Sequence, residues 1–174
     1  MKYFIDFASG SLIKHGEELC GDKVEFYNDD DQFIAVLSDG LSSGVKANIL
    51  ATLTSKIALT MLKEGMSIED VVDTITQTLP ICSQHKIAYS TFTLVKVDKD
   101  GITYIAEFDN PTVFFMRGND VIELNWNEKI LNGKTIREAR IELKERDRMI
   151  LISDGVEFAG SGKNLNYSWQ WKDI

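Results

Sequence analysis

Several residue types are scarce in this chain, and each scarcity excludes a class of protein. Of its 174 residues only two are cysteines, Cys20 and Cys82, which form neither a disulfide framework nor a Cys-x-x-Cys pair. The two histidines, His15 and His85, are too few and too isolated for a zinc site. No apolar run approaches the ~20 residues that span a bilayer, and the acidic Asp6 comes too early for a secretory signal. We therefore expect a cytoplasmic protein.

Basic residues are also in the minority. The chain has 19 Lys and Arg against 27 Asp and Glu, a formal net charge of −8. Without a basic stripe, binding to nucleic acid or to an anionic membrane is not expected. The hydrophobic fraction of 44% is enough for a real core, and the length suits one domain over 1–174.

Short alternating or apolar runs predict a β-rich chain. Turn residues at 98–101 and 117–120 separate neighbouring runs and indicate two hairpins. The expected strands lie at 3–14, 24–28, 32–38, 91–97, 102–106, 113–116, 121–124, 137–143 and 148–153, with a loose stretch at 125–135.

Two amphipathic helices are expected after the third strand. The first covers 44–64, with Ser42 or Ser43 as N-cap and Gly65 as its stop. The second follows Ser67, which forms a capping box with Asp70, and it ends at Pro80. The first helix has an apolar stripe at four-residue steps, made of Val45, Ile49, Leu53, Ile57 and Met61. Antiparallel hairpins with helices outside predict an α+β fold, a layered β-sandwich of mainly antiparallel sheets flanked by helices.

The tripeptide Ser-Asp-Gly occurs twice, each time directly after an apolar run. The copies are 38–40 and 153–155, and a third acid, Asp22, precedes the strand that leads toward the first copy. A carboxylate at the end of a buried strand is held by the sheet, and the adjacent glycine lets the backbone turn or approach a ligand. The chain therefore looks like a scaffold for an oxygen-ligand metal site.

Hard divalent cations such as Mg²⁺ and Mn²⁺ prefer such oxygen ligands. Two ions bridged by one carboxylate would activate a water for attack on phosphorus, and the carbonyl of Gly40 would be a further ligand. No nucleophilic side chain or histidine base is then needed. The alternative is that the Asp-Gly pairs are ordinary turns, as the sequence at 98–101 indicates elsewhere in the chain.

The order of these motifs resembles the PPM (PP2C-like) superfamily of metal-dependent protein phosphatases. The resemblance is to the bacterial branch typified by SpoIIE, RsbU and RsbX, and it covers nearly the whole chain. It rests on Gly21-Asp22, on Ser38-Asp39-Gly40-Leu41-Ser42-Ser43-Gly44 before a helix, on Ala88-Tyr89-Ser90-Thr91-Phe92-Thr93, and on Ser153-Asp154-Gly155.

The resemblance implies roles for the acids at these positions. Asp39 would bridge two Mn²⁺ or Mg²⁺ ions, Gly40 would offer its carbonyl to one of them, and Asp154 would bind the second. Asp22 would bind through water or directly, and the three aspartates would be the catalytic residues. The implied reaction is hydrolysis of phosphoserine or phosphothreonine in a protein. The implied substrate is a partner-switching protein, such as a STAS-domain anti-sigma antagonist or a stressosome component.

The chain departs from the family pattern in two places. Ser42 stands where the second motif has a glycine, and no final Asp-Asp pair occurs before the end, where Asp173 is in the wrong context. We expect either a domain truncated before its last strand or a protein without the last ligand. In both cases the second metal site lacks one ligand of the family pattern. The rival function is a catalytically degenerate phosphatase fold that binds a phosphoprotein or another partner.

Other conspicuous residues have plainer interpretations. The mixed charges around Arg137 predict a solvated strand face, and Lys46 predicts a solvated lysine. Cys20 is interpreted as buried filler, and Trp126 as a packing residue.

Overall fold

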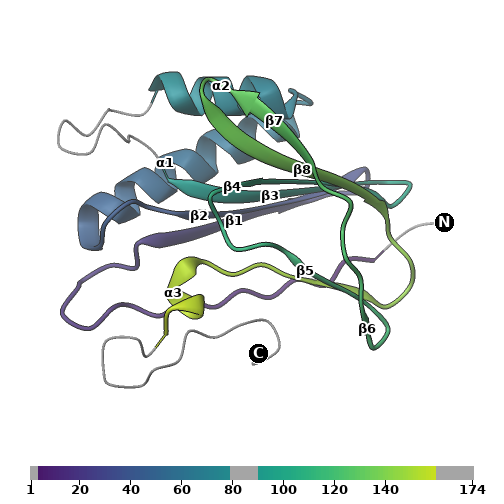
Figure 1. Ribbon diagram of the computed structural model, residues 1–174, viewed down its shortest axis with the longest axis horizontal. Helices are drawn as coiled ribbons and strands as arrows, with labels where there is room; N and C mark the ends of the chain where they lie inside the picture. Colours follow the sequence, from purple (N-terminus) through teal and green to yellow (C-terminus); the bar gives the residue numbers. More distant parts are fainter. Residues whose placement is uncertain (1–3, 79–89, 160–174) are drawn as a thin grey trace.

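The structure is a computed structural model that describes residues 4–78 and 90–159 of the chain. Two antiparallel sheets form a sandwich, and two long helices cover the outer face of the larger sheet (Figure 1). The larger sheet has the order β1 (Asp22–Asn28), β2 (Gln32–Asp39), β3 (Thr91–Asp98), β4 (Ile102–Phe108), β8 (Lys134–Glu142) and β7 (Asn127–Leu131). The smaller sheet has the order β6 (Asp120–Val121), β5 (Phe114–Arg117) and β9 (Asp147–Ile150). The expected layered α+β fold is thereby confirmed.

Most predicted strands are present, and the differences are local. No strand forms within residues 4–13, so the helices follow the second strand of the structure rather than the third. The strand expected at 121–124 ends at Val121, and the one expected at 148–153 ends at Ile150. The loose stretch at 125–135 contains β7, which pairs with β8. Ile5 and Phe7 pack against the inner core without a ladder, and the Phe7 ring contacts two aromatic rings of the larger sheet, whereas Phe4 and Leu12 are exposed.

Both helices have the expected positions. Helix α1 spans Gly44–Lys63 and helix α2 spans Ile68–Thr78, while Pro80 lies outside the described residues. The capping box at the start of α2 is formed, because Ser67 Oγ accepts from the backbone N–H of Asp70 (3.1 Å) and Asp70 Oδ2 accepts from Ser67 N–H (3.4 Å). Neither helix is long and apolar enough to cross a bilayer.

The predicted apolar stripe of α1 is wrong in its first half. Val45, Ile49 and Leu53 are 50%, 52% and 42% exposed. The face that packs against the sheet consists instead of small residues over the first three turns, followed by Leu62 near the end. Small side chains allow a helix to approach a sheet closely, and that approach outweighs the larger apolar area on the other face. The buried residues of α1 are Gly44, Ala47, Ala51, Thr54, Ser55, Ala58 and Leu62.

Each face of the larger sheet contributes to a separate core. On the outer face, strand residues such as Ile34 and Leu94 pack against α1 and α2. On the inner face, strand residues such as Phe33 and Ile105 pack toward Met149 of the smaller sheet. This alternation assigns odd-numbered residues of β2, β3, β4 and β8 to the space between the sheets.

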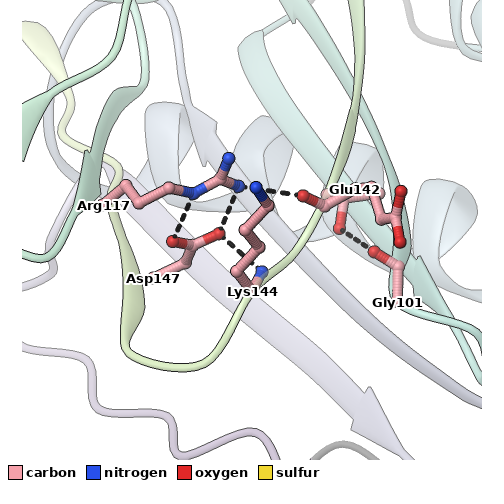
Figure 2. A network of polar contacts seen from close by, with 6 residues as sticks. Gly101, Arg117, Glu142, Lys144 and Asp147 are labelled. Atoms are coloured by element: carbon pink, nitrogen blue, oxygen red, sulfur yellow. Dashed lines mark hydrogen bonds and ion pairs between the residues drawn. The ribbon is translucent and has the colours of Figure 1, made fainter. Parts of the chain in front are cut away.

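An ion-pair network ties the smaller sheet to the larger one (Figure 2). Arg117 on β5 donates two hydrogen bonds to the carboxylate of Asp147 on β9 (2.9 and 2.7 Å) and one to the carbonyl oxygen of Glu142 on β8 (2.9 Å). Burial of Asp147 opposes its ionisation, but the hydrogen bonds and charge of Arg117 outweigh that effect, and the pKa lies below its ordinary value. The contacts of Arg117 therefore hold β5 and β9 of the smaller sheet to the end of β8 in the larger sheet.

Candidate metal centre

Two of the predicted acids lie at one edge of the larger sheet. Asp22 is the first residue of β1 and Asp39 the last residue of β2, and the two are direct partners in the antiparallel register. Directly opposed residues share one face of a sheet, with Cβ atoms roughly 5 Å apart. That face is the inner one, because the odd-numbered residues of β2 point between the sheets. The apolar run before Asp39 therefore delivers this carboxylate to its predicted position.

The third acid, Asp154, follows the last strand of the smaller sheet. Strand β9 ends at Ile150, so Asp154 does not end a strand but begins the short helix α3 (Asp154–Glu157). Ser153 Oγ donates to Asp22 Oδ2 at 2.7 Å, although the two residues are 131 positions apart. The side chain of Asp154 shares a hydrogen bond with Asp39. The second Ser-Asp-Gly copy therefore meets the first copy and Asp22 at one place.

The pKa of Asp39 reflects the proximity of these three acids. Burial raises its pKa first, and the charges of Asp22 and Asp154 together with hydrogen bonds to both raise it further, to about 8. None of the described lysines and arginines lowers it. Three carboxylates that face one another without a cation are costly unless one keeps a proton or a metal ion supplies the missing charge.

The donor set fits a hard cation. All three side chains offer oxygen, the ligand type that Mg²⁺ and Mn²⁺ prefer. Among the described residues, no group of three or more His, Cys, Asp and Glu side chains is placed so that all of them could hold one metal ion. A magnesium-type site needs less than a cage, since the ion keeps several waters and uses one or two carboxylates together with substrate phosphate. Asp39 together with Asp22 or Asp154 would offer that number of carboxylates.

Two glycines let helix α1 lie against this edge. A Cβ added to Gly40 would overlap the backbone of Ala47, and one added to Gly21 would lie 3.3 Å from the Ala47 Cβ. The N–H of Gly40 donates to the carbonyl oxygen of Gly21 at 3.2 Å. The glycine after Asp39 is thus required by close packing of the helix.

The turn between β2 and α1 is strained at the position where the family motif has glycine. Ser42 has a φ of +86°, which is left-handed backbone that side chains other than glycine rarely adopt. Ser43 is the N-cap of α1, but its side chain accepts no hydrogen bond from the helix N–H groups, and its hydroxyl donates to Glu17 Oε1 (2.6 Å). The start of α1 thus has a carboxylate beside it, as the helix dipole favours.

Several participants were missed by sequence reasoning. Ser153 stands inside a recognised motif, yet its bond to Asp22 depends on tertiary structure. Glu17 has no sequence signal that could have found it. Arg137 is only partly solvated, with 34% of its side chain exposed, because it pairs with the buried Glu107 at 3.4 Å and lies over the ring of Trp126. The predicted packing role of Trp126 is confirmed. Of the motif at 88–93, residues 88 and 89 lie outside the described residues, as do Cys82, His85 and Asp173.

Known proteins are similar to this chain in sequence and in fold. The sequence profile of the family described as stage II sporulation protein E (SpoIIE) matches residues 29–166, which is more than half of the chain. Stage II sporulation protein E of Bacillus subtilis (strain 168) is 26% identical over 129 residues, covering 72% of this chain and 16% of that protein. The chain therefore spans less than a fifth of the length of this curated relative.

Solved structures agree with the profile. The PP2C phosphatase domain of Bacillus subtilis SpoIIE, solved with a fragment of its regulatory domain, matches with a TM-score of 0.70 at 24% identity, over 84% of this chain and 44% of that one. RsbX in complex with magnesium matches with a TM-score of 0.65 at 19% identity, over 83% of this chain and 71% of that one. At these identities the structures establish the fold. The chain therefore belongs to the SpoIIE family and has the PP2C-type phosphatase fold.

Proposed function

We propose that this protein is a metal-dependent protein serine/threonine phosphatase. The observation that carries the proposal is the convergence of Asp22 and Asp39, at the ends of two strands of the larger sheet, with Asp154, at the start of α3. Neither turn formation nor packing explains why three acids from distant parts of the chain meet there. The fold of the matched structures is that of PP2C phosphatases, in agreement with such a centre.

Each residue of the centre has a proposed role. Asp39 would bridge two Mn²⁺ or Mg²⁺ ions, with the carbonyl of Gly40 as an additional ligand. Asp154 would hold the second ion, and Asp22 would bind through water or directly. Ser153 holds the Asp22 carboxylate by its hydrogen bond, which fixes one oxygen of that group.

The bound ions supply a water of lowered pKa and neutralise phosphoryl oxygens. The chain itself must keep the carboxylates ionised and oriented. The raised pKa of Asp39 means that its proton leaves when cations bind. A phosphoserine or phosphothreonine would bind beside Asp39 and Asp154.

The proposed substrate is a phosphorylated partner-switching protein in the cytoplasm, of the STAS-domain or stressosome type. Other structures with the same fold include one described with the bacterial stressosome and one of RsbU joined to RsbW domains from Mycobacterium tuberculosis. These related structures are the support for a partner-switching protein as the substrate class.

A second candidate function is binding without hydrolysis. It is favoured by the incomplete cage, since no three acids of the described chain are arranged as a full ligand set. In that case the fold would recognise a phosphoprotein, with Asp22, Asp39 and Asp154 as remnants of a catalytic centre.

Hydrolysis of p-nitrophenyl phosphate with and without Mn²⁺ separates the two functions. We expect activity that requires Mn²⁺ and that is lost in Asp39→Asn. Asp100→Asn is the matched control, because Asp100 also precedes a glycine, but in an exposed hairpin turn. Absence of activity in the unmodified chain, together with Mn²⁺-independent binding of a phosphoprotein, would favour the binding module.

A further inference from the structure

The turn that connects β4 to β5 lies at the same edge of the sandwich as the proposed metal centre. Strand β4 ends at Phe108, which pairs with Phe92 on β3, one position from the Thr91 that pairs with Asp39. The turn begins at Asp109, whose φ is +47°. Aspartate is one of the few residues besides glycine that adopt this left-handed backbone readily, as a tight turn requires.

Asn110 in this turn holds two threonines of β3 with its side-chain amide. Thr91 Oγ1 donates to Asn110 Oδ1 at 3.0 Å, and Asn110 Nδ2 donates to Thr93 Oγ1 at 2.9 Å. Thr93 is 1% exposed, so its hydroxyl has no access to water as an alternative partner. The amide uses both its acceptor and its donor on neighbouring positions of one strand face.

Of the two threonines bonded to Asn110, Thr91 is the one that lies next to the proposed metal centre. It lies directly opposite Asp39 in the register of β2 and β3, on the same inner face. The carbonyl oxygen of Thr91 also accepts from the hydroxyl of Ser38 at 3.2 Å, and Ser38 is the neighbour of Asp39. The end of β2 that carries Asp39 is thus bonded to the backbone of Thr91, and the side chain of Thr91 is in turn held by Asn110.

The other end of the turn is anchored by a buried acid. Glu107, 2% exposed, accepts the N–H of Val113 with Oε1 at 2.6 Å. Its Oε2 makes no hydrogen bond and lies 3.4 Å from Arg137 Nη1, which also donates to Thr112 Oγ1 at 2.8 Å. The turn is therefore fixed at Asn110, at Thr112 and at Val113, and it cannot relax without breaking buried polar contacts.

We propose that Asn110 is a positioning residue for the metal centre, acting on Asp39 through Thr91. The inference rests on the proposed function, because it concerns how firmly Asp39 is presented to a divalent cation. Outer contacts that orient metal ligands contribute roughly 10–100-fold to metal affinity. Asn110 touches neither Asp39 nor a substrate, so its effect is on orientation and not on the chemistry.

Mn²⁺ affinity, measured by titration calorimetry, tests this assignment without depending on catalysis. We expect Thr91→Val, which removes only the hydroxyl, and Asn110→Ala each to weaken Mn²⁺ binding about 10-fold. The double variant is expected to be no weaker than either single one, since both break the same contact. Thr91→Ser restores the hydroxyl and is expected to restore the affinity.

Two further variants make the outcome decisive. Gln32→Ala removes a hydrogen bond at the other end of β2, donated by Gln32 Nε2 to the carbonyl oxygen of Lys63, and is expected to leave Mn²⁺ affinity unchanged. If Thr91→Val and Asn110→Ala lower the melting temperature but bind Mn²⁺ like the parent, their role is structural and the inference is overturned. Asp39→Asn separates the two proposals: if it loses Mn²⁺ while Asn110→Ala does not, only this inference fails, whereas unchanged binding in Asp39→Asn overturns both.

Discussion

Asp39 and Asp22 stand directly opposite each other at the ends of two neighbouring antiparallel strands, and Asp154, the first residue of α3, interacts with Asp39. Burial and these two acids raise the pKa of Asp39 to about 8. An arrangement that holds one carboxylic acid protonated near neutral pH is unfavourable for folding. It becomes favourable when a divalent cation replaces the proton. The proximity of the three carboxylates thus both destabilises the metal-free protein and favours the binding of a metal ion.

Asp39→Asn is expected to stabilise the metal-free protein at pH 8. The folded pKa of about 8 lies above the ordinary value of 3.8, so the folded state retains a proton that the unfolded state loses. The free energy of unfolding therefore falls as the pH rises from about 4 to about 8, and the asparagine variant lacks this fall. Urea titrations at pH 5 and pH 8 measure it. A variant no more stable than the parent at pH 8 would contradict the account of Asp39.

Glu107→Gln is expected to raise stability at high pH for a similar reason. Burial raises the pKa of Glu107 to about 7 from 4.5, and its contacts with Val113 and Arg137 only partly offset burial. Stability from this group is complete below about pH 4.5 and is lost as the pH rises to about 7, by up to about 3 kcal/mol. The variant should equal the parent at pH 4.5 and exceed it at pH 8. Equal pH profiles would show that Glu107 ionises freely.

Gly40→Ala is expected to lower the free energy of unfolding by about 1–3 kcal/mol, because the added methyl group overlaps the backbone of Ala47. The displaced α1 should also weaken Mn²⁺ binding at Asp39. Gly10→Ala is the matched control, since a Cβ there meets nothing within 4 Å. Thermal melts with and without Mn²⁺ measure both effects, and a Gly40→Ala variant as stable as Gly10→Ala would show that the helix can move away at no cost.

The sequence was sufficient for the sheet-end acids because their signal is local. An apolar run followed by Asp and Gly places a carboxylate at the end of a buried strand, and Asp39 is found there. The capping box of α2 is likewise local and is present. In both cases the residues that decide the outcome are neighbours in sequence. Asp154 was expected near Asp39 and does interact with it, although it begins α3 instead of ending a strand.

Where partners are distant in sequence, the pattern was insufficient. The exposed half of α1 was predicted to be buried, because the stripe of Val45, Ile49 and Leu53 is larger than the alanine face. What decides the burial is the close approach of Ala47 to Gly40, which no periodicity shows. Glu107 occupies an unremarkable strand position, and its burial follows from the sheet that covers it.

Calorimetric titration of the parent chain with Mn²⁺, alongside Asp22→Asn, Asp39→Asn, Asp154→Asn and Asp100→Asn, tests the central claim most directly. The account predicts that the parent and Asp100→Asn bind Mn²⁺ with the same affinity and that each of the other three variants binds at least about 10-fold more weakly. Proton release on binding should accompany the titration of the parent near pH 7 and be absent in Asp39→Asn. Unchanged affinity in Asp39→Asn and Asp154→Asn would show that these acids do not form one metal centre.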